Sequence, residues 1–156
     1  DPPEGAFTDP RHPKLGWRLY SIDAEKFNQP INWTKLRVDY VIPEYRSELT
    51  GESYILEMGF ERLNGVDFKK GCYVGQEVTA RMKHKTELHK GLVKIGSEQT
   101  MVNGEELFLN DKPIGSVLTV YDRSALAYVR LKNRDEILST KSTKRIFVDK
   151  NPIPSN

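Results

Sequence analysis

The sequence predicts an α+β fold in which a loop-rich part with two helices precedes a small antiparallel β-barrel. Two segments, residues 33–40 and 76–84, carry apolar side chains at helical spacing. After Leu88, five short apolar runs are separated by turn residues, which is typical of a small barrel. The chain has 156 residues, 37% of them hydrophobic, so it is long enough for one ordinary domain or two small ones.

The opening of the chain is expected to be extended. Residues 1–13 hold four prolines, a composition that predicts an extended or mobile segment. In residues 16–22 apolar and polar side chains alternate, with Trp17 and Leu19 on the same side. This period of two predicts a strand with one buried face.

The first helix is expected over residues 33–40. Trp33, Leu36 and Tyr40 recur at positions i, i+3 and i+7, Asn32 or Thr34 can cap the N-terminus, and a proline three residues after Tyr40 ends the pattern. The spacing predicts a short amphipathic helix.

Between the helices, residues 52–68 are expected to be compact and rich in loops, with a turn at Asn64-Gly65. A loop bracketed by Gly71 and Gly75 then leads into the second helix over residues 76–84. Cys72 therefore lies just before the N-terminus of a predicted helix.

The predicted barrel strands are short and lie 8–12 residues apart. They occupy residues 92–95, 106–109, 114–120, 125–130 and 145–148. The sequence accordingly predicts a first domain over residues 1–88, a barrel over residues 89–150 and a tail over residues 151–156.

Charge and cysteine content exclude several classes of protein. Lys+Arg 24 against Asp+Glu 22 gives a net charge of +2, too mild to imply a polyanion partner for the whole molecule. The longest uncharged stretch is nine residues, from 113 to 121, whereas a membrane-spanning helix needs about 20, so no membrane partner is expected. The lone Cys72 cannot form an intramolecular disulfide or a thiolate metal cage within this chain, which suits a reducing compartment. No targeting segment is visible in the residues given.

The loop around Cys72 carries the most informative chemistry. A thiol that precedes a helix N-terminus and follows two lysines, Lys69 and Lys70, lies in positive potential, which favours nucleophilic attack or metal ligation by the thiolate. The alternative is that Cys72 is a small buried hydrophobe and that the lysines are solvated.

Glu57 is the acidic residue of greatest interest. It lies between apolar neighbours, where a carboxylate is expensive to bury unless a partner donates hydrogen bonds to it. A flat heterocycle with N–H donors would be such a partner, and a structural salt bridge is the alternative. A metal site is not expected, because His84 and His89 stand at i, i+5 and do not share a helical face.

A local basic run leaves a nucleic-acid function open. Over residues 81–94, five lysines and arginines against one glutamate give a local charge of +4. Such a run binds polyanions or is simply a solvated face, and it contains no aromatic side chains for base stacking.

Residues 70–77 read Lys-Gly-Cys-Tyr-Val-Gly-Gln-Glu. This segment resembles the K-G-C-[YF]-x-G-Q-E signature of the YgfZ-type folate-binding proteins, relatives of the glycine cleavage T-protein, an aminomethyltransferase. Further stretches resemble the family in the same order, namely residues 9–11, 15–18, 36–39, 42–44, 56–57 and 64–68. One departure is Tyr40-Val41, which stands where the family often has Ala-Gly.

The resemblance implies the second half of a T-protein-like folate-binding domain, followed by a small antiparallel β-barrel. It implies a tetrahydrofolate-binding accessory protein for iron–sulfur cluster assembly or repair, whose partners are folate and iron–sulfur enzymes or assembly proteins. The expected location is the bacterial cytoplasm or, in a eukaryote, the mitochondrial matrix. Family members carry a further segment before residues 9–11, so the first half of the domain is expected as a separate chain or a removed segment.

The resemblance also assigns roles to single residues of the signature. Cys72 is the candidate reactive or cluster-contacting thiol, and Lys70 and Gln76 are its partners in the loop. Tyr73 and Glu77 are expected to contribute to the cofactor site.

The pterin ring of the folate is expected to be held by an acidic side chain, first Glu57 and second Asp39. Two rival functions stay open beside folate-dependent cluster assembly. The first is an aminomethyltransferase-like one-carbon transferase, and the second is an RNA-binding module that uses the barrel and the basic run.

Overall fold

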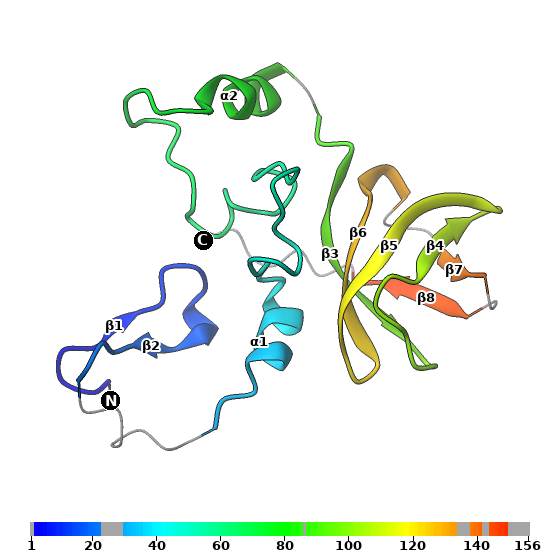
Figure 1. Cartoon of the computed structure of the whole chain (residues 1–156), viewed down its shortest axis with the longest axis horizontal. Coiled ribbons are helices and arrows are strands. Elements are labelled where there is room, and N and C mark those ends of the chain that lie inside the picture. Colours follow the sequence, from blue (N-terminus) through cyan, green and yellow to red (C-terminus); the bar gives the residue numbers. More distant parts are fainter. Residues whose placement is uncertain (1, 23–29, 86, 134–137, 142–143, 150–156) are drawn as a thin grey trace.

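The structure is a computed structural model, and it describes residues 2–22, 30–85, 87–133, 138–141 and 144–149. Within these residues the chain forms a closed six-stranded antiparallel barrel, two α-helices and a separate two-stranded sheet (Figure 1). The predicted mixed α+β fold with a small barrel is confirmed. That the first part is half of a T-protein-like domain stays a prediction, and the tail over residues 151–156 lies outside the described residues.

The barrel has the strand order β3-β6-β5-β4-β7-β8 and closes on itself. Its strands are β3 (Lys90–Ser97), β4 (Glu106–Leu109), β5 (Lys112–Tyr121), β6 (Ser124–Arg130), β7 (Leu138–Thr140) and β8 (Arg145–Val148). A short 3-10 helix, η3 (Leu131–Asn133), follows β6. Five strands coincide with the predicted runs, whereas β7 was not predicted, because three residues are too few to show a period of two.

Side chains along β6 point alternately into the barrel and out of it, and buried residues lie on both sides. Ala125, Ala127 and Val129 point into the barrel and are fully buried in its core. Leu126 points outward and is also fully buried, because it packs against the first helix. At Gly115 of β5 a Cβ atom would lie 2.2 Å from the carbonyl oxygen of Tyr128, so only glycine fits there.

Helix α1 (Trp33–Tyr40) forms over the predicted residues and packs on the outside of the barrel. Its buried residues are Arg37 and Val38, and the three apolar residues whose spacing predicted the helix are only partly buried. Asn32 caps it, its side-chain oxygen accepting the Lys35 N–H at 2.9 Å. Val38 packs with Leu126 in a second small core. The helix ends at Val41, whose φ of 52° and ψ of 55° lie in the left-handed region. That conformation is rare for a β-branched residue, and it falls where the resembling family often has glycine.

The two-stranded sheet of β1 (Phe7–Thr8) and β2 (Trp17–Arg18) encloses the 3-10 helix η1 (Pro13–Leu15). The strand predicted over residues 16–22 is shorter than expected, and the prediction of a buried face is wrong, because Trp17 is 54% exposed. Polar and stacking contacts hold the hairpin instead: the Arg11 guanidinium lies 5.1 Å from the Trp33 ring centroid, and His12 stacks on Tyr40.

Residues 51–64 form successive turns, which confirms the predicted loop-rich stretch. A long loop then leads to α2 (Gln76–Lys85), which lies apart from α1 and from the barrel (Figure 1). No helix in the described ranges has the length and apolar character needed to span a membrane.

Candidate functional site

Cys72 is exposed at the surface, in the loop before α2. The alternative that it is a small buried hydrophobe is therefore wrong. Two hydrogen bonds close the turn that follows it: the Tyr73 N–H donates to Gln76 Oε1 at 3.1 Å, and the Gln76 N–H donates to the Tyr73 carbonyl at 3.2 Å. Between them Gly75 adopts a φ of 86°, which a side chain would oppose. The sequence thus builds a fixed turn beside an accessible thiol.

Two lysines precede this thiol in the chain. Lys69 and Lys70 are exposed, and the Lys70 ammonium lies 5.3 Å from the centroid of the Tyr73 ring. The thiolate is the form of a cysteine that attacks electrophiles and ligates metals.

Helix α2 is attached to the rest of the chain by side chains from its C-terminal half. Lys83 forms an ion pair with Glu61 and lies 5.4 Å from the centroid of the Phe68 ring, and the same ring meets His84 edge to face. Glu77 pairs with Arg81 one turn along the helix at 2.9 Å. In the N-terminal half, next to Cys72, Glu77 and Val78 are exposed, whereas Thr79 is buried.

Glu57 lies where the loop-rich stretch meets the barrel. Its carboxylate accepts a hydrogen bond from the Tyr128 hydroxyl, and its backbone carbonyl accepts the Leu92 N–H at 2.9 Å. Burial raises the pKa of Tyr128 above its ordinary value, and the hydrogen bond to Glu57 raises it further. Among the described residues the side-chain partner of Glu57 is a phenol, and not the cation that a structural salt bridge would supply.

Asp39 bridges α1 and the barrel. It forms ion pairs with Lys35 of its own helix and with Lys94 of β3, the latter at 2.8 Å. Burial alone would raise the pKa of Asp39, but the hydrogen bonds and charges of the two lysines outweigh burial and hold it below its ordinary value. A pterin at Asp39 would therefore have to compete with two ammonium groups.

The structure brings some predicted site residues together and not others. Residues 70–77 form one local unit around Cys72, whereas Glu57 and Asp39 contact barrel strands instead. One cavity of about 340 Å³ lies on the barrel. It is lined by Lys94, Ile95, Gly96, Ser124, Phe147, Val148 and Asp149, none of which is a predicted site residue.

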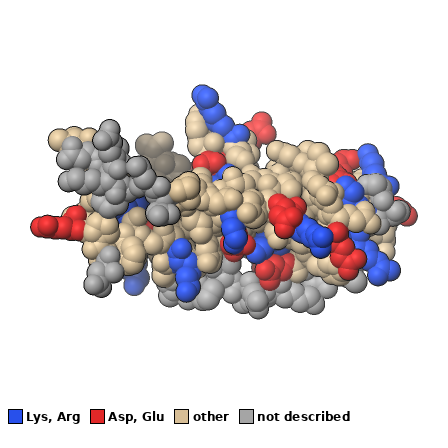
Figure 2. All heavy atoms as spheres, turned by 90° about the horizontal axis from the view of Figure 1, so that it is seen from below, with Lys and Arg blue, Asp and Glu red and all other residues tan. Residues whose placement is uncertain are grey.

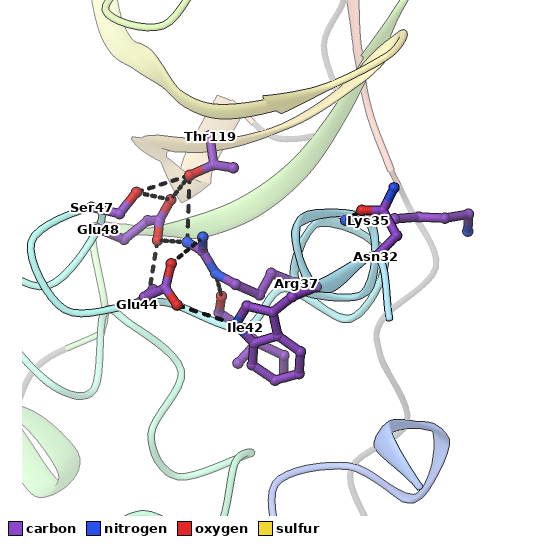
Figure 3. Close-up of polar contacts among 9 residues, drawn as sticks. Asn32, Lys35, Arg37, Ile42, Glu44, Ser47, Glu48 and Thr119 are labelled. Carbon is purple, nitrogen blue, oxygen red and sulfur yellow. Dashed lines mark hydrogen bonds and ion pairs between the residues drawn. The ribbon is translucent and has the colours of Figure 1, made fainter. Parts of the chain in front are cut away.

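A buried polar network that the sequence did not reveal joins α1 to the barrel (Figure 3). The Arg37 guanidinium pairs with Glu48, whose side chain is fully buried, and with Glu44 at 2.7 Å. Glu48 also accepts hydrogen bonds from Ser47, at 3.1 Å, and from Thr119 of β5. In the sequence, the only local sign of this network is that Arg37 lies between two apolar residues of the helix. The contact between Glu48 and Thr119 joins residues 71 positions apart, which no local pattern reveals.

A second polar cluster lies in the segment that was expected to be merely extended. Asp9 is buried and pairs with Arg11 at 2.7 Å and with Arg18 at 2.8 Å. The hydrogen bond from Arg11 is the main reason that the pKa of Asp9 lies well below its ordinary value. Asp9 and Arg11 belong to the first stretch of the family resemblance, and their contacts give that stretch a structural role.

The basic run is less positive in the fold than in the sequence. Arg81, Lys83 and Lys94 pair with Glu77, Glu61 and Asp39. On the face seen in Figure 2, acidic and basic side chains alternate without a large area of one sign. The described part of the chain also contains no group of three or more His, Cys, Asp or Glu side chains that could hold a metal ion.

The fold and the Cys72 loop define an α+β protein with a small closed barrel and an exposed thiol in the turn that leads into α2. No protein-family model matches the chain. Curated proteins do: it is 37% identical over 98 residues to the mitochondrial iron-sulfur cluster assembly factor IBA57 of Mus musculus, a match that covers 58% of this chain and 27% of that protein.

Two further relatives carry the same printed function. The human mitochondrial iron-sulfur cluster assembly factor IBA57 is 36% identical over 95 residues, covering 56% of this chain and 27% of the relative. The mitochondrial IBA57 homolog of Neurospora crassa is 36% identical over 98 residues, covering 56% and 22%. The chain thus matches about a quarter of the length of these curated relatives.

Proposed function

We propose that this chain acts in iron–sulfur cluster assembly in the mitochondrial matrix, with Cys72 as the thiol that contacts the cluster. The observation that carries the proposal is the exposed Cys72 beside a hydrogen-bonded turn and two lysines, in a chain similar to mitochondrial iron–sulfur cluster assembly factors. The charge and exposure of the loop suit a thiolate that ligates iron.

The ligand requirement defines how Cys72 acts. Protein iron–sulfur clusters are generally held by four cysteine ligands, and this chain supplies one. In this scheme Cys72 is one of several ligands of the cluster, and the remaining ligands lie outside the 156 residues given. The cluster is cargo in this scheme.

The first test offers a cluster whose other ligands come from a small molecule. A [2Fe–2S] cluster coordinated by glutathione is added anaerobically to the chain, and binding is followed by the visible circular dichroism of a protein-bound cluster. We expect a signal from the unsubstituted chain and from Val102→Ala, an exposed barrel control. Cys72→Ser should abolish the signal, and equal uptake by Cys72→Ser would refute the proposal.

We also propose that the chain binds tetrahydrofolate, with Glu57 as the acidic contact. The support is the family resemblance and the position of Glu57, which lies at the joint between the loop-rich stretch and the barrel and whose described side-chain partner is a neutral hydroxyl. Glu57 is thus a stronger candidate than Asp39, because Asp39 is held by two lysines.

Calorimetric titration with tetrahydrofolate tests this second part separately. We expect Glu57→Gln to weaken binding at least tenfold, whereas Glu52→Gln, an exposed turn control, leaves it unchanged. If the chain does not bind tetrahydrofolate but takes up the glutathione cluster, folate binding is wrong and the role of Cys72 stands.

A further inference from the structure

The cavity of about 340 Å³ on the barrel has no part in the function proposed above. Its floor lies where β6, β3 and β8 run side by side (Figure 1). Gly96 of β3 pairs with Ser124 of β6 on one side and with Phe147 of β8 on the other. In each strand the adjoining residues include members of the barrel core, so these three residues face outward.

The fold does not require glycine at position 96. The φ of Gly96 lies outside the positive range that favours glycine. Pairing with β6 keeps one register from Lys90 to Gly96, without a bulge. An added Cβ atom would meet nothing closer than the Arg123 carbonyl oxygen at 3.8 Å, which is an ordinary contact. Glycine weakens a strand interior and often marks a place where a ligand approaches the backbone closely, and here it leaves the floor of the cavity open.

Phe147 supplies an aromatic surface beside this floor. Its side chain lines the cavity and is 44% exposed, although the residue lies within a strand of the closed barrel. A planar ring placed over Gly96 can pack against this phenyl ring, and aromatic pairs contribute more than their apolar burial alone. The volume of the cavity falls within the range of roughly 300–1,000 Å³ that is usual for small-molecule sites.

The polar groups of the cavity favour an uncharged ligand. Its lining contains one cation, Lys94, and one anion, Asp149. The Lys94 ammonium already pairs with Asp39 of α1 at 2.8 Å, so little net charge is left to attract an ion. The Ser124 hydroxyl forms no hydrogen bond with the described part of the chain, and a hydroxyl can donate to a ligand or accept from it.

We propose that this cavity binds an uncharged, planar nitrogen heterocycle of the nucleobase type. The ring lies over Gly96 and against Phe147, and its polar edge meets the Ser124 hydroxyl. This inference does not depend on the proposed function. Glu57 contacts β3 at Leu92, four residues before Gly96, which is about 13 Å along a strand. The cavity and the proposed folate contact can therefore be tested separately.

The test uses adenosine and uridine as probes, because each carries a planar base and no charge. Each is titrated into the whole chain, and the backbone amides are followed by NMR. We expect saturable shifts centred on Gly96, Ser124 and Phe147 with at least one of the two nucleosides. AMP, which adds the charge of a phosphate, should bind no more tightly than adenosine. Absence of saturable shifts with both nucleosides, or at least tenfold tighter binding of AMP, would overturn the proposal.

Two substitutions identify the surface that holds the ring. Gly96→Val fills the floor with a side chain that suits a strand, so the urea midpoint of unfolding should stay the same or rise while nucleoside affinity falls at least tenfold. Phe147→Leu removes the aromatic surface and should weaken binding at least threefold. Its matched control is Phe7→Leu, at a similarly exposed phenylalanine of the hairpin, which should leave affinity unchanged.

The two substitutions also guard against a variant that fails to fold. Unchanged affinity in Gly96→Val with a retained midpoint would overturn the proposal. If Gly96→Val lowers the midpoint, the comparison of Phe147→Leu with Phe7→Leu decides, and equal affinity in those two variants would overturn it.

Discussion

The joint between α1 and the barrel and the surface at the start of α2 use charge in opposite ways. At the joint, Arg37 is 5% exposed and Glu48 fully buried, and each finds its partners within the chain. In the loop before α2, Lys69 and Lys70 are exposed close in sequence to Cys72 and Val74, and their ammonium groups form no ion pair with the described residues.

The difference separates a structural role from an interaction role. A charge that is buried must be paired within the fold, because an unpaired buried charge costs several kcal/mol. An exposed charge is solvated and stays available to another molecule at little cost to stability. Substitutions at the joint should therefore change the free energy of unfolding. Substitutions in the loop before α2 should leave it nearly unchanged.

The largest effect is expected from Arg37→Met, which keeps the length of the side chain but leaves Glu48 buried without its cation. The free energy of unfolding should fall by about 3–5 kcal/mol, as when one partner of a buried ion pair is removed. Urea unfolding measures the change. Arg81→Met, at an exposed pair on α2, is the control and should cost less than about 1 kcal/mol. Similar losses in the two variants would contradict the comparison.

The next effect concerns Asp9 and depends on pH. Because the pKa of Asp9 is lowered in the folded state from 3.8, its ion pairs contribute fully above that value, and the contribution is lost as the pH falls below it. Asp9→Asn should therefore be less stable by about 2 kcal/mol at neutral pH, since hydrogen bonds to charged groups contribute roughly that much. Its unfolding free energy should also depend less steeply on pH below 3.8 than that of the unsubstituted chain. Parallel pH profiles for the two proteins would show that Asp9 is not the titrating group.

Local patterns predicted most of the regular structure. The cap and spacing of residues 33–40 indicate α1, and short apolar runs separated by turn residues after Leu88 indicate five barrel strands, because these signals lie within a few residues of each other. The loop that carries Cys72 before α2 was also predicted, since its glycines and lysines are adjacent in sequence, but whether Cys72 is exposed was left between two alternatives. The Arg37–Glu48–Thr119 network was not, because it is created by packing between segments about 70–80 residues apart. The exposed hairpin was mispredicted because alternation alone does not show whether a second layer covers it.

A moderate effect is expected at the joint between Glu57 and the barrel. Tyr128→Phe removes the hydroxyl that donates to Glu57 but keeps the ring, so stability should fall by about 1 kcal/mol. Thermal or urea unfolding measures the change in stability. The control is Tyr54→Phe, at an exposed tyrosine close to Glu57 in the sequence. If Glu57 holds the pterin, Tyr128→Phe should also alter tetrahydrofolate affinity, whereas a purely structural contact would change stability alone.

The smallest effect is expected on α2 itself. Glu77→Gln removes the ion pair with Arg81, and it also removes a negative charge from the first turn of the helix. Contributions of this kind to helix stability are about 0.3–1 kcal/mol. Because α2 lies apart from the barrel and α1, the free energy of unfolding of the whole chain should change by less than about 1 kcal/mol (Figure 1). A loss of stability comparable to that of Arg37→Met would mean that α2 is held as firmly as α1, and the contrast between a structural joint and an interaction surface would no longer hold.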